Sequence, residues 1–323
     1  AAGADYQLGQ GYTAGAVNVA GYANVVADAA RGAPARLMLD DLSLFVNGRV
    51  SQYLNPFFEV ELSEGTLWRQ GRRPLADLSP RFVVERLYND SDLGAGFTFR
   101  AGKMLTPVGE WNMIHAAPLV WNVSKPMTTY RGFNRYTSGL GLNYLPPDGH
   151  LPELYLYWQP NGELIPKPAQ MVVREYVHAG GVHASWPIGL NDKIGVSLQR
   201  ARVRGGDEAQ TLLGLNASKT LGNLQLETEA TYARLSGSNP ARLREREWGA
   251  YLLGAYAVSD RLTLLARHEH FADRGAARGS ANSLLGLAYR PDPALVWKLE
   301  YVHSRGAALD VKSGVFGSFS VLF

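Results

Sequence analysis

The feature that most constrains this chain is a regular alternation of apolar and polar residues that recurs from one end to the other. Phe58-Glu59-Val60-Glu61-Leu62 shows it most sharply, and residues 97–100, 194–199 and 224–229 repeat it. Successive side chains of a β-strand point to opposite faces, so each segment predicts a strand with one apolar and one polar or small face. No run of the sequence approaches the roughly 18 apolar residues that a membrane helix requires. The chain is therefore predicted to be all-β.

Connections rich in turn residues divide the sequence into about sixteen predicted strands, and short connections alternate with longer ones. The seven short connections are 50–54, 89–94, 146–150, 187–191, 221–223, 259–260 and 291–293. The eight longer ones are 29–36, 64–80, 104–135, 159–174, 204–208, 236–244, 272–280 and 305–313. This regularity is typical of a transmembrane, antiparallel, up-and-down β-barrel and not of two packed sheets with Greek-key links. A closed barrel would also satisfy every backbone group within a membrane.

Composition excludes several classes of protein. The 323 residues include 32 Lys+Arg and 29 Asp+Glu, and no basic block suggests a nucleic-acid partner. The absence of cysteine excludes disulfides, thiolate metal sites and cysteine nucleophiles. Ala1-Ala2-Gly3-Ala4-Asp5 is interpreted as a mature start left after signal cleavage, and 1–13 as an N-terminal periplasmic segment. We expect one barrel domain over 1–323.

The last predicted strand places Val315, Gly317, Phe319, Val321 and Phe323 on one face. This pattern resembles the C-terminal signature of bacterial outer-membrane barrels, which implies that the barrel-assembly machinery reads Phe323. A periplasmic C-terminus and an even strand number put both termini in the periplasm, with short periplasmic turns and longer extracellular loops. The expected surroundings are membrane lipid and lipopolysaccharide.

The longest connection, 104–135, is the candidate for a functional loop. About 30 residues without a repeating pattern are usually functional or disordered, and its proline and aromatic content argues against disorder. The lumen of a sixteen-stranded barrel is wide and aqueous, so discrimination between solutes requires an element that folds inward. A lid on the extracellular mouth is the alternative. The predicted constriction residues are Glu110, Trp111, Asn112, His115, Lys125, Arg131 and Arg135.

Residues 99–109, with a Gly102-Lys103 pair running into Pro107-Val108-Gly109, resemble a segment of the phosphate-selective porin O/P superfamily. Residues 82–88, which include Glu85 and Arg86, resemble the strand before it. The resemblance covers roughly 80–145 and implies a sixteen-stranded channel, often a homo-oligomeric trimer. It does not imply phosphate selectivity, because selective members line the pore with an arginine ladder and loop lysines.

The predicted lumen of this chain instead mixes charges of both signs. The pore-lining candidates are Arg49, Glu59, Glu61, Arg100, Lys193, Glu227, Glu229, Arg267, Glu269, Lys298 and Glu300. Opposite charges across a wet lumen create a transverse field that sorts solutes by size and dipole. A further basic set lies in predicted loops and either funnels anions inward or binds lipopolysaccharide phosphates: Arg69, Arg72, Arg73, Arg131 and Arg135.

These patterns predict passive diffusion of small hydrophilic solutes or ions, with no cofactor. The rival is a scaffold or sheath that holds an envelope partner protein; a sheath should show an open bore, a porin a constriction made from its own loops. An enzyme is not predicted, because no nucleophile motif occurs and His178 and Ser185 lie seven residues apart on one strand. His268 and His270, with Glu269 between them, lack a third ligand, so no metal site is predicted.

Overall fold

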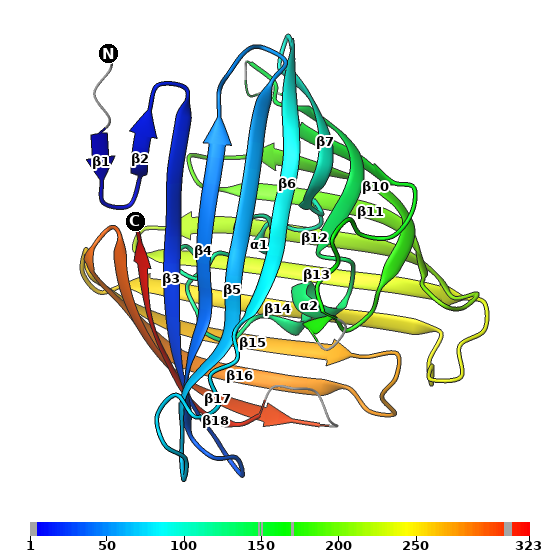
Figure 1. The fold of residues 1–323 in the computed structure, drawn as a ribbon. Coiled ribbons are helices and arrows are strands. Elements are labelled where there is room, and N and C mark those ends of the chain that lie inside the picture. The colour runs from blue at the N-terminus through cyan, green and yellow to red at the C-terminus, as the bar shows by residue number, and fades with distance from the viewer. Residues whose placement is uncertain (1–4, 148, 150, 169–170, 307–311) are drawn as a thin grey trace.

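The structure, a computed structural model, describes residues 5–147, 149, 151–168, 171–306 and 312–323. Sixteen strands, β3 to β18, form one closed antiparallel sheet, and two short strands precede them (Figure 1). The strands are β1 Asp5–Gln7, β2 Gly11–Ala14, β3 Val17–Ala30, β4 Arg36–Gly48, β5 Asn55–Arg69, β6 Arg81–Gly94, β7 Phe97–Leu105, β8 Tyr136–Tyr144, β9 Glu153–Gln159, β10 Tyr176–Pro187, β11 Lys193–Val203, β12 Ala209–Leu221, β13 Leu224–Ser236, β14 Arg246–Ala257, β15 Leu262–Ala272, β16 Ser280–Asp292, β17 Leu295–Arg305 and β18 Gly314–Leu322. The predicted transmembrane barrel is confirmed.

The last strand closes the barrel against the first long one. β18 pairs with β3 from Gly314 opposite Ala30 to Leu322 opposite Tyr22. Beyond it, Gly21 and Phe323 exchange two backbone hydrogen bonds of 2.8 and 2.9 Å. A Cβ at Gly21 would lie 2.8 Å from the ring of Phe323, so the glycine leaves room for that ring. The residue predicted as an assembly signal thus lies at the seam, while its recognition by the assembly machinery stays a prediction.

The two faces of the wall are the reverse of those of a soluble sheet. On β5, Glu59, Glu61 and Ser63 are buried inside the barrel, whereas Leu62 is exposed on the outside. Leu285 on β16 has 67% of its surface exposed. Such a wall, apolar outside and polar inside, is suited to lipid around it and to water within. Aromatic side chains add to the exposed outer face: Trp186, Trp248, Tyr256, Tyr289, Trp297 and Tyr301.

The connections fall near the predicted positions, with shifted boundaries, but their lengths alternate less regularly than predicted. Residues 31–35, predicted as a longer connection, are fewer than residues 49–54, predicted as a short one. The turn predicted at 89–94 is wrong, because β6 continues to Gly94 and turns at Ala95 and Gly96. Both turn residues have a positive φ, 51° and 84°, as a two-residue hairpin turn of type I′ requires. Asn89 and Asp90 read as turn residues from sequence, but they pair with β5 and β7 in the structure.

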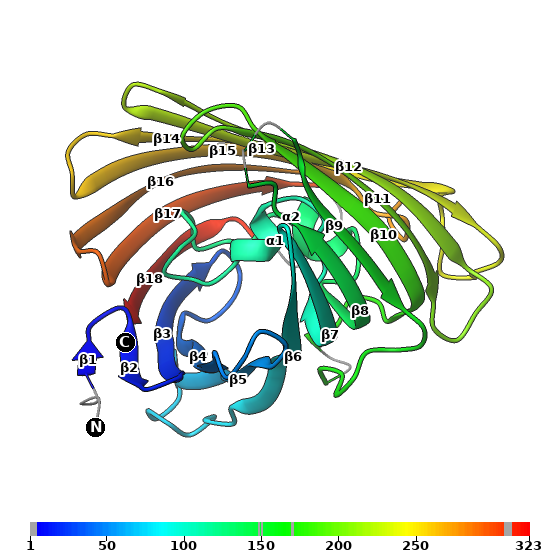
Figure 2. The same ribbon diagram turned by 90° about the horizontal axis from the view of Figure 1, so that it is seen from above.

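One long connection runs inside the barrel. The segment between β7 and β8 carries two short helices, α1 Trp111–Ile114 and α2 Met127–Arg131. Viewed along the barrel, both helices lie within the ring of strands (Figure 2). Within the described residues, no helix is long and apolar enough to cross a membrane.

Candidate functional site

The loop between β7 and β8, residues 106–135, leaves and rejoins the wall through a hydrogen-bonded neck. The Thr106 N–H donates to the Arg135 carbonyl at 2.9 Å. The side-chain amide of Asn112, which is fully buried, donates to the carbonyls of Thr106 at 2.8 Å and Arg135 at 3.0 Å. Val108 and Phe133 share an apolar cluster with Leu212 on β12. Both ends of the loop are therefore fixed at one place on the inner wall.

Glu229 on β13 fastens the first turn of the loop. One oxygen of its carboxylate accepts the N–H groups of Glu110 at 2.8 Å and Trp111 at 2.7 Å. Gly109 has φ +66°, and a Cβ there would lie 2.6 Å from the other oxygen. The Pro-x-Gly segment noted in the sequence is thus the turn that presents two N–H groups to a buried carboxylate. A single oxygen that accepts two successive N–H groups fixes the direction of the turn.

Two further glutamates repeat this arrangement on alternate strands. Glu269 on β15 accepts the N–H of Thr128 at 2.8 Å and its hydroxyl at 3.0 Å. The two oxygens of Glu300 on β17 accept the N–H groups of Val123 and Ser124, each at 2.8 Å. Three carboxylates on β13, β15 and β17 therefore hold three successive parts of the loop against one side of the barrel.

Basic side chains of the same wall bind the loop carbonyls. Arg267 donates to the carbonyl of Ser124 at 2.7 Å and to its hydroxyl at 3.0 Å. Lys298 donates to the Ala117 carbonyl, and Arg290 to that of Pro118 at 2.8 Å. The wall thus matches the polarity of the loop backbone, with carboxylates against N–H groups and cations against carbonyls.

The opposite wall, from β4 to β6, carries charges that the loop does not cover in this way. A register shift places Asp41 opposite Asn24 and Leu39 opposite Val25, so Asp40 is the extra residue of a β-bulge. The Asn24 amide donates to Asp40 at 2.9 Å. A bulge re-aims a side chain, and here it brings two neighbouring carboxylates to the inner face.

Lys125 of the loop faces this acidic wall. Burial lowers the pKa of the Lys125 ammonium, but the carboxylates of Asp40 and Asp41 outweigh it, and the pKa is raised above its ordinary value. Lys125 therefore stays charged at neutral pH, with opposite charges on the loop and on the wall.

A second bulge, on β6, adds another charged pair. Glu59 lies opposite Arg86 and Val60 opposite Val84, which leaves Glu85 as the extra residue. Arg86 pairs with Glu59 and lies over the ring of Phe57, 4.4 Å from its centroid. Glu85 is fully buried and pairs with Lys167 of the connection between β9 and β10. A second long connection thus also enters the barrel.

The predicted pore-lining residues fall into three groups. Glu229, Arg267, Glu269, Lys298 and Glu300 lie inside the barrel but are buried under the loop that they bind, and Glu227 accepts the Trp121 indole N–H at 3.0 Å. Glu59, Glu61 and Arg100 lie on the other wall, where Arg100 pairs with Asp90 at 2.7 Å. Arg49 is exposed just beyond β4, at the short-turn end, and Lys193 lies 3.8 Å from Glu110.

The predicted constriction residues all belong to the inward loop, but they do different things. Trp111 and Asn112 are buried, and Arg131 contacts Asp273 at 3.3 Å. Burial lowers the pKa of the His115 imidazole well below its ordinary value, so that side chain is neutral at pH 7. Lys125 faces the acidic wall. Seen from the side and from above, α1 and α2 lie within the ring of strands and between the strand ends (Figures 1 and 2).

Sequence reasoning missed Asp40, Asp41 and the anchoring role of the glutamates. The Asp40-Asp41 pair between Leu39 and Leu42 interrupts the alternation of apolar and polar residues. Two consecutive polar residues in such a strand indicate a β-bulge, so this signal was present in the sequence. The anchoring role left no local signal, because each glutamate meets a loop segment more than 100 residues away in sequence.

Two groups considered for chemistry are placed as follows. His268 is exposed and contacts the Ser283 hydroxyl at 2.9 Å, and His270 stacks on Trp248. The described residues hold no cluster of three His, Cys, Asp or Glu side chains suited to a metal ion. His183, not His178, meets a serine: its Nδ1 lies 2.8 Å from Ser197 Oγ. Ser197 is fully buried between β11 and the loop, so no substrate reaches it in this structure.

The closed sixteen-stranded barrel with a loop inside it has the fold of outer-membrane porins. The chain is similar in structure to a loop-deletion mutant of OmpT, an outer membrane protein of Vibrio cholerae, with a TM-score of 0.68 and 14% identity over 96% of this chain and 100% of that one. OmpF of Salmonella typhi, in complex with daunomycin, gives 0.67 and 9% over 99% of each chain. The anion-selective porin from Comamonas acidovorans gives 0.63 and 13% over 95% and 98%.

At these identities the likeness shows the fold alone. No family model and no curated protein matches the sequence. The resemblance to the phosphate-selective porin O/P superfamily over about 80–145 therefore stays a prediction, while the porin-type barrel that it implied is confirmed.

Proposed function

We propose that this protein is an outer-membrane channel for the passive diffusion of small hydrophilic solutes, with the loop 106–135 as its constriction. The observation that carries the proposal is the attachment of that loop to the inner wall by Glu229, Glu269 and Glu300. A loop held at three points narrows a bore that sixteen strands would otherwise leave wide.

The remaining passage lies between the loop and the acidic wall. Asp40 on β4 and Lys125 of the loop line one cavity there, and Asp41 and Glu61 are buried on the same wall. Opposite charges on the two sides support the transverse field expected from the sequence. Glu61 and Lys125 are among the residues predicted to supply it, whereas Asp40 and Asp41 are not. Solutes would be sorted by size and dipole rather than by net charge alone.

The same observation favours a channel over a sheath for a partner protein. A sheath needs an open bore, and this bore already contains the chain's own loop (Figure 2). The orientation, with both termini in the periplasm, and assembly as a homo-oligomer are parts of the proposal. Exposure on intact cells of an epitope inserted in the connection between β13 and β14 tests the orientation, and its absence from the cell surface would reverse it.

Liposome swelling tests the proposed function. Liposomes that contain the folded barrel should admit a pentose several times faster than a trisaccharide, because the loop narrows an aqueous path. Liposomes with heat-unfolded protein are the control and should admit neither sugar. Failure of the folded protein to admit even the pentose would contradict passive diffusion.

A further inference from the structure

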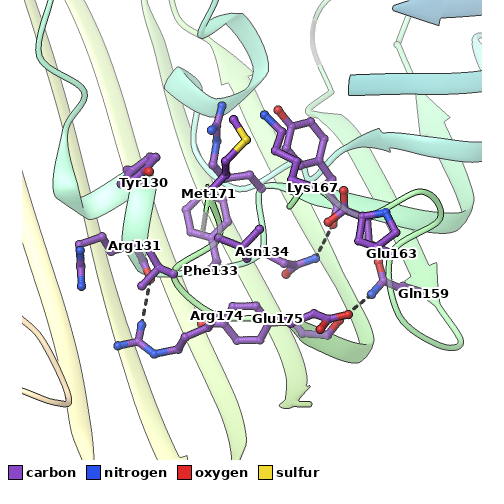
Figure 3. A pocket seen from close by; sticks show the side chains of 16 residues that line it. Tyr130, Arg131, Phe133, Asn134, Gln159, Glu163, Lys167, Met171, Arg174 and Glu175 are labelled. Carbon is purple, nitrogen blue, oxygen red and sulfur yellow. Dashed lines mark hydrogen bonds between the residues drawn. The ribbon is translucent and has the colours of Figure 1, made fainter. Parts of the chain in front are cut away.

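A side cavity of about 450 Å³ lies between the end of the inward loop and the connection from β9 to β10. Residues 130–136 form one side of it, and residues 166–167 and 171–176 form another (Figure 3). Phe133, Met171 and the ring of Tyr130 give it an apolar surface. The volume is that of a small-molecule site, and such sites combine apolar lining with a few placed polar groups.

Almost all the charged groups around the cavity already have partners. Glu163 pairs with Lys103 at 2.6 Å, and Glu175 pairs with Arg204 at 2.6 Å. Three of the basic side chains that line the cavity are also paired with carboxylates. Lys167 pairs with Glu85, and Arg131 and Arg174 pair with Asp273. The acidic side chains of the cavity are therefore neutralised by their own partners.

Arg135 is the exception. Its guanidinium has no ion pair and no hydrogen bond with any residue that the structure describes, and its Nε is buried without a partner. The guanidinium lies 5.7 Å from the ring centroid of Tyr130 and 5.5 Å from that of Tyr136. It is thus held by two aromatic rings, with its hydrogen-bond donors unused.

Tyr136 supplies a second unused donor at the same place. Its side chain is 4% exposed, and its hydroxyl is buried with no hydrogen-bond partner among the described residues. Lys103 and Lys167 lie 5.1 and 5.0 Å from its ring centroid, so three cations surround one ring. An unsatisfied buried polar group destabilises the protein, and a ligand that accepts its hydrogen bond would recover that loss.

We propose that this cavity binds a small organic anion, with its carboxylate on Arg135 and the Tyr136 hydroxyl and its apolar part on Phe133, Met171 and Tyr130. An arginine with free donors matches a carboxylate by two parallel hydrogen bonds. The apolar surface favours an organic anion over inorganic phosphate. The inference deepens the proposed channel function, since the site lies inside the barrel, but binding is measured independently of permeation.

Benzoate, titrated into the folded barrel in detergent and followed by calorimetry, tests the site. Arg135→Gln should weaken binding by about tenfold, since it removes a charge-assisted pair. Tyr136→Phe should weaken binding about threefold, because it removes a hydroxyl that donates to the carboxylate. A hydroxyl that does not contact benzoate would leave the affinity unchanged. Benzyl alcohol, a neutral analogue of similar shape, should bind much more weakly than benzoate.

Arg49→Gln is the matched control, because it removes an exposed arginine at the short-turn end and should leave benzoate binding unchanged. Arg135→Lys should retain part of the affinity, which makes the test informative even if the glutamine variant folds poorly. The proposal is overturned if the unmodified protein does not bind benzoate, or if both Arg135 variants bind it as tightly as the unmodified protein. It is also overturned if benzyl alcohol or inorganic phosphate binds as tightly as benzoate. Binding without any solute permeation would keep this site and contradict the channel.

Discussion

Replacing residues 110–131 with a short Gly-Ser linker should raise the single-channel conductance of the barrel roughly twofold or more, because the remaining sixteen strands enclose an aqueous bore. Val108 and Phe133, whose shared cluster with Leu212 holds the loop ends, are kept in this variant. The barrel should still fold, since the strand pairing of β3 to β18 does not pass through the loop. Recording single channels in planar bilayers measures the change.

A second variant tests whether the loop must be held against the wall, and not only be present, to narrow the bore. Changing Glu229, Glu269 and Glu300 together to glutamine keeps the full loop but replaces one acceptor oxygen of each side chain by an NH2 donor, which weakens the hydrogen bonds to the loop N–H groups. We expect larger open-channel current noise, as the loop moves in the bore. Glu245→Gln changes an exposed glutamate between β13 and β14; it is the control and should give the same recordings as the unmodified protein.

The first variant, in which a linker replaces residues 110–131, decides the role of the loop. If its conductance equals that of the unmodified protein, the loop is not the constriction.

Arg274→Ala should cause the largest loss of stability of any single substitution considered. Arg274 is almost fully buried, and its guanidinium pairs with Glu208 and with Glu247, the latter at 2.8 Å. It also donates to Gln210, and its backbone N–H donates to Glu247 at 3.0 Å. Breaking a buried ion pair from one side typically costs about 3–5 kcal/mol, because the remaining charges stay buried without a counter-ion.

The urea concentration at which the barrel unfolds, read from its heat-modifiable migration in gels, checks this prediction. Arg278→Ala, an exposed arginine on the same connection between β15 and β16, should unfold at the same concentration as the unmodified protein. Equal midpoints for the Arg274 and Arg278 variants would show that the buried network adds nothing to stability. A selective loss at Arg274 would identify it as the group that joins the connection between β15 and β16 to Glu208 and Glu247.

The strands could be predicted because their signals are local. Alternation with period two and clusters of turn residues lie within each hairpin, and they indicated sixteen strands and the approximate positions of the connections. The positions of the turns were less certain, since Asn89 and Asp90 have turn-forming side chains yet continue β6 through partners on neighbouring strands. Backbone pairing across the sheet overrides such local preferences.

The site could be predicted only in part. The length and composition of the loop indicated an inward element, but the acidic residues that hold it read as ordinary lumen charges. Glu300 and Val123, for instance, meet only because the closed barrel brings β17 opposite the middle of the loop. The same holds for Asp40 and Asp41, whose shared inward direction depends on a bulge in the pairing of β3 and β4. Such contacts depend on tertiary geometry, which no single segment encodes.

The central claim is that the barrel conducts through a bore narrowed by its own loop. Single-channel recording of the unmodified protein in planar bilayers tests it most directly. We expect discrete, stable open steps, smaller than those of the variant that lacks residues 110–131. Well-folded protein that inserts into the bilayer but gives no current steps would contradict the account.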